Sequence, residues 1–538
     1  MDQGRGAHAS PSDAERREVE RHDVIPPAYA NYMLGVLVLV YVFNFLDRQI
    51  VSILAERIKA DLQLSDAQIG FLYGTAFAVF YAIFGIPLGR LADVWDRRRL
   101  IAIGLATWSV MTALTAGARN FLELTLARIG VGVGEASATP AAYSMLSDYC
   151  PPAQRASVLA IYSSGIYIGA GVGLGIGGLI VDRWDAAFAG VPPPFGLRGW
   201  QVAFLAVGLP GLLLALWVRT LREPLRGQSD GLVAATALSA QPFREFAREL
   251  RAVLPPLTVV HLALQGGGAR RRVRANLGAA AAIAAAVVVL TRALGTPAQW
   301  IALGVGLYAA VSWAQALAVR DRPGFTLVFR TQSLRYAAVG FSLLAFTGYG
   351  VGFWVPPFFL RTHGVSEAQA GLILGGTAAL AGWLGVTLGG VWSDQWRHRA
   401  ACARLYVGMA TAILPVPFLV WMLFTSNTAL AYALNFPLGV LSSMWIGAGA
   451  STVQDLMLPR MRAIASAAHL LLVTFIGLAL GPYTMGRLSV AFGDLRSALL
   501  CAVVANALAA MFLARAAHYL PADEASRLER ARAAGEGR

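Results

Sequence analysis

The chain has 538 residues, of which 57% are hydrophobic and only 14% are charged. Soluble globular domains carry about 25% charged residues, so this composition excludes an ordinary soluble protein. The formal net charge of +14 raises nucleic acid as a partner. Most of the 44 basic residues, however, fall in loops at the predicted cytoplasmic ends of apolar runs, which is the positive-inside pattern of membrane proteins and argues against nucleic acid.

The reactive residues exclude several other classes. The three cysteines, Cys150, Cys402 and Cys501, are far apart and lack metal-ligand spacing, so we expect neither a disulfide framework nor a metal site. The only lysine, Lys59, does not follow a G-x-x-x-x-G sequence, which excludes a phosphate-binding loop and ATP-driven pumping by this chain alone. We expect no cofactor and no enzymatic activity.

Long apolar runs from residue 31 to residue 519 predict an all-α polytopic membrane protein. Residues 1–30 are polar and mixed in charge, so we expect a cytoplasmic tail and not a secretory signal. An N-terminal six-helix bundle is predicted within 31–226, with helices at 32–54, 67–90, 100–117, 121–147, 156–182 and 201–221. A C-terminal six-helix bundle is predicted within 335–520, with helices at 335–360, 368–392, 402–424, 428–453, 463–490 and 497–519. Residues 521–538 form a second predicted tail, and the positive-inside pattern places both termini in the cytoplasm.

A central insert, residues 227–334, separates the two bundles. The segment QPFREFARELRAVL has apolar residues at helical spacing with arginines between them, which predicts a helix lying on the cytoplasmic membrane surface. The basic run RRRVR at 270–274 is expected against anionic lipid headgroups. Two apolar runs follow, at about 277–291 and 298–319. We predict that they cross the membrane as a hairpin, giving twelve plus two helices; two helices packed at the surface are the alternative.

The two bundles repeat one plan. LSDAQIGFLYGTAFAVFYAIFGIPLGRLADVWDRR begins at Leu64, and VSEAQAGLILGGTAALAGWLGVTLGGVWSDQWRHR begins at Val365. Serine, glutamine, glycine, aspartate, tryptophan and arginine residues coincide at one constant offset. Internal repeats of this kind mark secondary transporters, whose substrate site lies between the halves near the membrane midplane.

Four charged residues are predicted inside the membrane, all in the first bundle: Asp47, Arg48, Arg128 and Glu135. A charge at this depth costs about 3 kcal/mol. Helix spacing places Arg128 and Glu135 on one face about 10.5 Å apart. Asp47 and Arg128 are predicted at a similar depth in the membrane, so we expect them to pair. We expect Arg48 to lean toward Glu135. Either the pairs only join two helices, or protonation of one acid frees its arginine and biases the inward- or outward-facing state; we favour the second.

Several motifs resemble those of known transporters. Gly89-Arg-Leu-Ala-Asp93-Val-Trp-Asp-Arg97-Arg98 resembles the loop signature of the major facilitator superfamily, although Val94 and Asp96 depart from it. Arg128-Ile-Gly130-Val-Gly132 resembles the fourth-helix signature. The glycine ladder resembles the fifth-helix one and is expected to serve close packing: Gly165, Gly169, Gly173 and Gly177.

More narrowly, FLDRQ, RIGVGVGEASATP, LREPLRG and SDYCPPAQRAS together are similar to sequences of the spinster family. Members of that family move lysophospholipids and sphingoid lipids. The resemblance implies the major facilitator fold and assigns proton coupling to the positions of the four intramembrane charges. In the second bundle, His469 is the only deep titratable residue, and we expect it to be a satisfied polar side chain and not a coupling group.

The repeated loop predicts a cytoplasmic latch. In this interpretation Asp93 faces a helix N-terminus of the second half and holds the outward-facing state. The motif residues are Gly89, Asp93, Arg97 and Arg98 with their copies Gly390, Asp394 and Arg399; Asp148 and Arg155 complete it and are echoed by Asp455 and Arg462. The alternative is a basic loop that only sets topology.

Aromatic residues predict an apolar substrate cavity. Pro356-Pro357 is expected to break its helix beside Phe353 and Trp354, since such breaks are tolerated where a cavity or neighbour satisfies the freed carbonyls. Further lining residues are predicted from the first two helices: Tyr41, Phe45, Tyr73 and Phe77. Lipid-facing aromatics are the alternative.

These observations predict a proton-coupled, alternating-access transporter of an amphipathic substrate such as a lysophospholipid or sphingoid lipid. A drug or organic-anion exporter of the same fold is the alternative, and a non-transporting membrane sensor is a third class. All but one of the 44 basic residues are arginine, which suggests a GC-rich bacterial genome and an inner membrane. We expect membrane lipids as neighbours and a monomeric protein.

Overall fold

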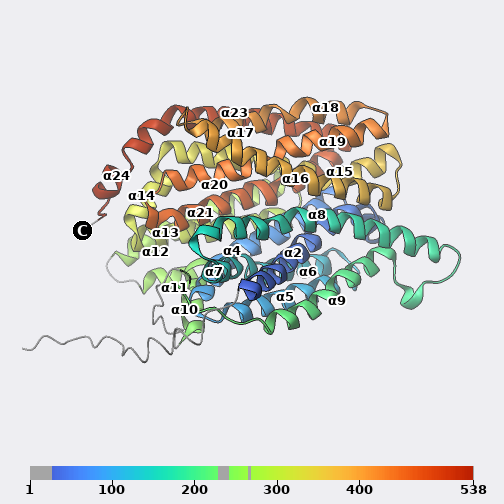
Figure 1. Ribbon diagram of the computed structural model, residues 1–538, viewed down its shortest axis with the longest axis horizontal. Helices are drawn as coiled ribbons and strands as arrows, with labels where there is room; N and C mark the ends of the chain where they lie inside the picture. The colour runs from blue at the N-terminus through green and yellow to red at the C-terminus, as the bar shows by residue number, and fades with distance from the viewer. Residues whose placement is uncertain (1–26, 228, 230–240, 265–267, 537–538) are drawn as a thin grey trace, which may run out of the picture.

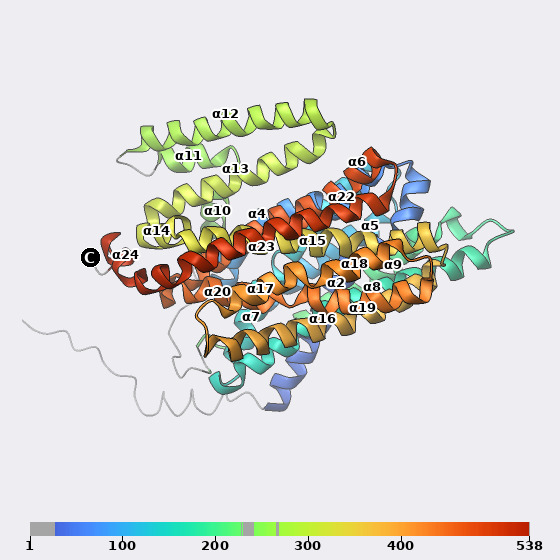
Figure 2. The same ribbon diagram turned by 90° about the horizontal axis from the view of Figure 1, so that it is seen from above.

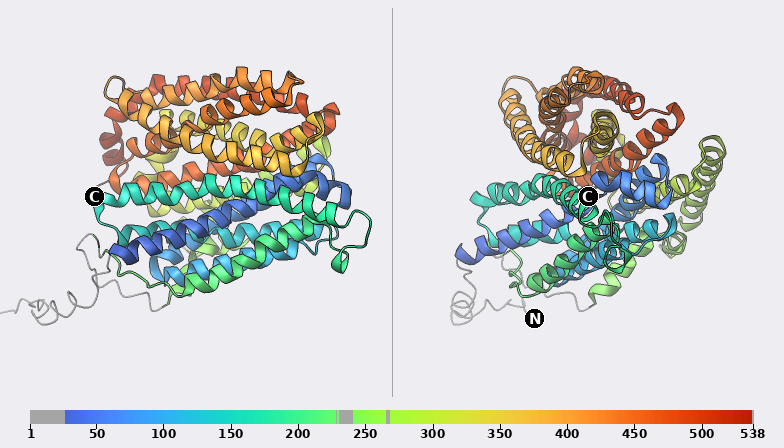
Figure 3. Two further views of the ribbon diagram at one scale, coloured as in Figure 1. Left: turned by 45° about the vertical axis from the view of Figure 1, so that its right-hand side comes forward. Right: turned by 90° about the vertical axis from the view of Figure 1, so that its right-hand side faces the viewer.

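The computed structural model describes residues 27–227, 229, 241–264 and 268–536, and all regular structure in this part of the chain is helical. Most of the predicted N-terminal tail lies outside these residues. Figure 1 shows the N-terminal bundle in blue to green below the C-terminal bundle in yellow to red. Seen end-on, the two bundles lie one against the other with the insert on their flank (Figure 3). The fold is therefore the predicted pair of six-helix halves.

The N-terminal half contains α2 (Pro27–Leu62), α3 (Asp66–Tyr73), α4 (Thr75–Val94), α5 (Arg97–Thr115), α6 (Phe121–Glu135), α7 (Ala138–Tyr149), α8 (Pro152–Ala187) and α9 (Gly199–Arg219). The C-terminal half contains α15 (Gln332–His363), α16 (Glu367–Arg397), α17 (Ala403–Ile413), α18 (Pro415–Phe424), α19 (Thr428–Ser443), α20 (Trp445–Asp455), α21 (Arg462–Leu472), the π-helix η4 (Val473–Ala479), α22 (Leu480–Phe492) and α23 (Leu495–Ala525). The helix α24 (Arg527–Ala533) follows.

Several predicted single helices consist of two consecutive ones. Gly74 separates α3 from α4, and the fourth predicted helix ends its first segment at Glu135. Leu414, which separates α17 from α18, directly precedes Pro415. Proline lacks the backbone donor of the helical hydrogen-bond ladder, while Leu414 itself keeps helical backbone angles. Asp66–Val94 and Ala403–Phe424 are nevertheless each long and apolar enough for one membrane span.

The insert forms α10 (Pro242–Val253), α11 (Leu257–Ala263), α12 (Ala269–Leu294), α13 (Pro297–Arg320) and α14 (Arg322–Arg330). Helices α12 and α13 run side by side as a hairpin on one flank of the bundles (Figure 2). In the described residues, twelve segments are long and apolar enough to cross a membrane, and both hairpin helices are among them. Their membrane crossing stays a prediction.

The glycine ladder on α8 packs directly against α2. A carbon added at Gly165 would lie 3.2 Å from the Val38 carbonyl oxygen, and one added at Gly169 would lie 2.4 Å from the Val42 carbonyl oxygen. Gly173 continues the row against Leu46. The absent side chains therefore allow α8 to approach the backbone of α2, the helix that carries Asp47 and Arg48.

The predicted break at Pro356-Pro357 is wrong, because α15 continues through both prolines to His363. Pro357 lacks the backbone donor that would bond the carbonyl of Phe353, four residues earlier. That carbonyl instead accepts a hydrogen bond from Ser52 Oγ of α2 at 2.5 Å. The freed backbone group thus joins the two halves, and the helix stays intact because a neighbour satisfies it.

We expect Gly169→Ala to lower the melting temperature of the purified protein, because the new methyl group meets the α2 backbone. Overpacking of this kind costs about 1–3 kcal/mol. Gly35→Ala is the matched control, since nothing lies within 4 Å of a carbon added there and alanine is the better helix former. Thermal unfolding in detergent checks both variants, and equal melting temperatures would contradict the packing role of the ladder.

Candidate functional site

The four predicted intramembrane charges lie together inside the N-terminal half. Asp47, Arg128 and Glu135 are at most 2% exposed, and the Arg48 side chain is 11% exposed. Arg48 Nε and Nη2 each lie 2.6 Å from Glu135 Oε2, so the pair expected between α2 and α6 is present. A buried ion pair needs good geometry to offset its desolvation, and this arginine makes two contacts to one oxygen.

Aromatic rings surround the Arg48 guanidinium. Its Cζ lies 4.4 Å from the centre of the Phe77 ring, 4.8 Å from Phe45 and 5.0 Å from Tyr81. Aromatic faces attract a cation most strongly when both are shielded from water. The cage therefore holds the guanidinium in place where few polar groups are available, and Tyr81 is a member that the sequence interpretation did not include.

The expected ion pair between Asp47 and Arg128 is not formed. Asp47 Oδ2 accepts a hydrogen bond from Thr112 Oγ1 of α5 at 3.0 Å, whereas Arg128 Nη1 is 3.5 Å from the Asp47 backbone oxygen. The carboxylate faces α5, whose contribution the pairing of α2 with α6 left out. Within the described residues, Asp47 Oδ1 and the Nε and Nη2 atoms of Arg128 have no hydrogen-bond partner. This side of the site consequently has unused donors and an unused acceptor.

Glycines in the RIGVGVGEA segment set the position of α6. A carbon added at Gly132 would lie 2.6 Å from the Phe77 carbonyl oxygen of α4, and one at Gly134 would lie 2.8 Å from the Trp108 nitrogen of α5. Glu135 is the last residue of α6. Close packing on two sides thus delivers its carboxylate to Arg48.

Ion pairs join the two halves at the end of the molecule opposite the C-terminus, which we call the outer end. Arg361 of α15 lies 2.7 Å from Asp66 and 2.5 Å from Glu56. Arg57 of α2 lies 2.6 Å from Glu367, the first residue of α16. We call these five residues the outer gate, because these three ion pairs cross between the halves.

The outer gate follows the internal repeat. Asp66 and Glu367 occupy the same position in the repeated Ser-[Asp/Glu]-Ala-Gln segment, and each pairs with an arginine at the end of the first helix of the other half. Ser489 of α22 also donates to Asp66 at 2.8 Å. The sequence interpretation missed this site, although the acidic residue shared by both repeat copies was its signal.

Several of the predicted latch residues form contacts within their own half in the part of the chain that the structure describes. Buried Arg97 pairs with Asp148, and with Glu223 at 2.7 Å. Arg98 Nη1 donates to the Leu221 carbonyl, and Arg155 Nη2 donates to the Ser147 carbonyl. These contacts fasten the loops after α4 and α7 to the end of α9.

In the other half, Asp455 pairs with Arg404 and, at 3.3 Å, with Arg397. Asp394 lies 3.3 Å from Arg404. The Asp93 side chain is 60% exposed and lies 3.8 Å from Arg90 of its own helix. Gly89 and Gly390 leave open space or one distant contact for an added carbon. The latch between halves stays a prediction.

The predicted cavity aromatics occupy two different settings. Phe45 and Phe77 belong to the cage around Arg48, and Tyr41 stacks on Tyr162 at 4.4 Å between ring centres. Tyr73 lies 4.2 Å from Phe353. Trp354 is fully buried, and its Nε1 donates to the Pro482 carbonyl of α22 at 2.8 Å. Tyr73, Phe353 and Trp354 therefore lie beneath the outer gate.

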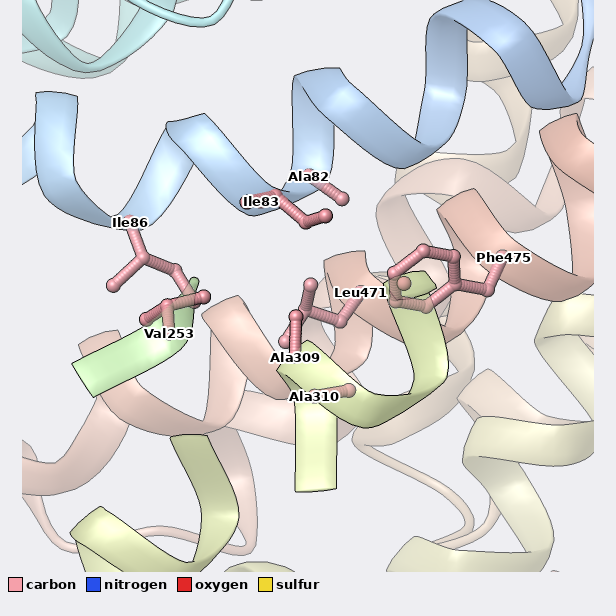
Figure 4. A pocket seen from close by; sticks show the side chains of 9 residues that line it. Ala82, Ile83, Ile86, Val253, Ala309, Ala310, Leu471 and Phe475 are labelled. Atoms are coloured by element: carbon pink, nitrogen blue, oxygen red, sulfur yellow. The ribbon is translucent and has the colours of Figure 1, made fainter. Parts of the chain in front are cut away.

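A small apolar cavity marks where the insert meets both halves. Figure 4 shows its labelled lining side chains: Ala82, Ile83 and Ile86 of α4, Val253 of α10, Ala309 and Ala310 of α13, Leu471 of α21 and Phe475 of η4. Nearer the outer end, Thr75 Oγ1 lies 2.7 Å from both Gln299 Oε1 of α13 and the Ala479 carbonyl. Helix α13 consequently covers the seam between α4 and the η4 segment.

His469 of α21 is half-buried and lies in an edge-on arrangement with the Phe341 ring, at 6.2 Å between ring centres. Its Nδ1 has no hydrogen-bond partner among the described residues. The prediction that His469 is a satisfied polar side chain is therefore wrong for Nδ1.

Comparison with known proteins gives consistent relatives. A sequence model of the Major Facilitator Superfamily matches residues 37–482. An MFS-type efflux pump of Mycolicibacterium smegmatis is 26% identical over 87% of this chain and 86% of its own length. Human protein spinster homolog 1 is 24% identical over 89% of this chain and 76% of its own. A crystal structure described as a bacterial homolog of the human lysosomal transporter Spinster, inward-facing and occupied, aligns with a TM-score of 0.65 and 25% identity, covering 94% of this chain and 99% of that one.

We expect Arg361→Ala to shift the protein toward an outward-open arrangement, because it removes contacts to both Glu56 and Asp66. Charge-assisted hydrogen bonds contribute about 2 kcal/mol, or about thirtyfold in the ratio of the two states. Outside labelling of a single cysteine introduced by Gln49→Cys, with the native cysteines replaced, measures the change. Arg198→Ala is the matched control, because Arg198 pairs at the same end with Asp61 of its own half. Equal labelling in both variants would refute the gate.

Proposed function

The chain belongs to the Major Facilitator Superfamily, and from this premise we propose that it is a proton-coupled transporter of amphipathic, lysolipid-like molecules working by alternating access. Membership confirms an integral membrane transporter and not an enzyme. Among the described residues, twelve segments are long and apolar enough to cross a membrane, ten of them in the two halves and two in the insert, which fits that assignment. The coupling ion and the substrate are the steps that need argument.

The outer gate supports alternating access. Ion pairs across the outer end hold the halves together there, whereas the Arg97 and Arg404 networks at the other end stay within single halves. Among the described residues, the direct ion pairs between the halves lie at the outer end, an arrangement suited to opening at the other end. We therefore assign the structure to the inward-facing side of the cycle, the state given for the similar bacterial structure.

The observation that carries the proposal is the buried pair of Arg48 and Glu135 beside the half-satisfied Asp47. Protonation of Glu135 would cancel its charge and release Arg48. Asp47 is the neighbour of Arg48 in the chain. Binding of one proton can therefore move the Arg48 guanidinium from one carboxylate to the other within the site. A purely structural pair would gain little from a second buried acid that bonds only a threonine.

The same site supports the proposed substrate class. Arg128 has two guanidinium nitrogens without an acceptor in the described residues, and aromatic rings line the surrounding helices. A molecule with a phosphate group and an acyl chain supplies both an acceptor and apolar surface. The likeness to human spinster homolog 1 supports a lipid-like substrate, and the likeness to the MFS-type efflux pump supports the alternative of a drug or organic anion.

We further propose a bacterial inner membrane with both termini in the cytoplasm and a monomeric working unit. The arginine-rich loops lie at the end that carries the C-terminus, which supports this orientation. Under this orientation the outer gate faces away from the cytoplasm.

Asp47→Asn should abolish flux driven by a pH gradient and leave substrate exchange partly intact, because the variant no longer releases a proton at that position. The measurement is uptake into proteoliposomes beside a thermal melt. Glu529→Gln is the matched control, since Glu529 is exposed on α24. Full pH dependence in Asp47→Asn would exclude Asp47 as the coupling group. Early melting, with a loss of about 3–5 kcal/mol, would mark a structural role.

Arg128→Gln should weaken binding of a lysophospholipid about tenfold, because one charge-assisted contact to its phosphate is lost. Binding of a sphingoid base, which lacks the phosphate, should change little. Titration of the purified protein with both lipids, a sugar and a cationic drug checks this. Preference for the sugar or the drug would contradict the lipid assignment, and equal losses for both lipids would contradict the role of Arg128.

A further inference from the structure

Exposed arginines gather on the insert near its inner end. Three of these arginines lie on α10 at a spacing that puts them on one side of the helix. Three more arginines lie in the first turns of α12. We call this set the arginine face: Arg244, Arg248, Arg251, Arg270, Arg271 and Arg274. Helix α11 contacts both α10 and α12, which brings the two groups to one part of the surface. Figure 2 shows α11 beside α12 on this flank.

The two acids of α10 form ion pairs with arginines that lie outside the arginine face. Glu245 lies 3.0 Å from Arg90 of α4, and Glu249 lies 3.1 Å from Arg320 of α13. Burial is the largest cause of the lowered pKa of His261 on α11; the charge of Glu249 raises that pKa, and the charges of Arg248 and Arg251 lower it.

Apolar side chains are exposed beside these arginines. Phe243 of α10 is 58% exposed, Leu264 is 77% exposed, and Leu277 of α12 is 51% exposed. Beyond Leu277, α12 is apolar and outward-facing along the hairpin. A surface that changes from arginine to continuous apolar residues within one or two helical turns matches the boundary between lipid headgroups and acyl chains.

We propose that the arginine face binds anionic phospholipids of the adjoining membrane leaflet, with their phosphates at the guanidinium groups and their chains along α12. Charge complementarity selects the headgroup, and the adjoining apolar wall selects a lipid over a soluble anion. Arginine suits this role because its planar donors match phosphate oxygens.

Bound lipid would also hold the insert against the transporter body. Phe243 lies 5.2 Å from Trp95, between ring centres, at the end of α4, and Glu245 pairs with Arg90 of the same helix. Val253 is buried against α4 and α13. Lipid bound to α10 and α12 together therefore stabilises the helices that cover the seam between the halves.

The test uses the full chain in neutral detergent, titrated with phosphatidylglycerol and with phosphatidylcholine, while bound lipid and melting temperature are measured. We expect tighter binding and a larger melting shift with phosphatidylglycerol, weakened by salt. Arg270→Gln, Arg271→Gln and Arg274→Gln combined should reduce that preference at least tenfold. An attraction of about fivefold per arginine is the expected scale at an anionic surface.

The matched control removes three exposed arginines remote from this face, by Arg119→Gln, Arg183→Gln and Arg292→Gln. It has the same net charge and should keep the preference for phosphatidylglycerol. Equal binding of both lipids by the unaltered protein would overturn the proposal. So would an equal loss in control and test variants, or displacement of the lipid by millimolar inorganic phosphate.

Discussion

The ion pair between Arg48 and Glu135 is the constraint around which the N-terminal half is arranged. Two charges in the membrane interior are tolerated only with close contacts on every side. Glycines of α6 and α8 supply that closeness, and aromatic rings of α2 and α4 shield the guanidinium. The consequence of this arrangement is a site in which a single proton changes the balance of charge.

The outer gate complements this site. It uses exchangeable ion pairs between halves, whereas the buried pair lies within one half. Partly exposed pairs contribute less than buried ones, so a conformational change can break the few pairs that form the gate. The hydrogen bond from Ser52 to the Phe353 carbonyl connects the halves between these two levels. Helix α2 carries both Asp47 and Arg57, and any shift of this helix therefore acts on both sites.

Much of the fold was predictable from the sequence, because the apolar runs indicate the membrane spans and the internal repeat indicates the two halves. The pair of Arg48 and Glu135 was also predictable, since helix spacing and depth leave few partners for a buried charge. The orientation of Asp47 was not, because it depends on Thr112 of a helix that shows no charge inside the membrane. The continuity of α15 depends likewise on Ser52, a contact between distant segments that local proline rules do not include.

The central claim is that a buried carboxyl group of the N-terminal half changes its protonation during the cycle. Infrared difference spectroscopy of the purified protein, with and without substrate, measures the carbonyl stretch of protonated carboxyl groups directly. The account predicts a substrate-dependent band in the unaltered protein that is altered by Glu135→Gln or Asp47→Asn. A band that is absent, or that persists unchanged in both variants, would contradict it.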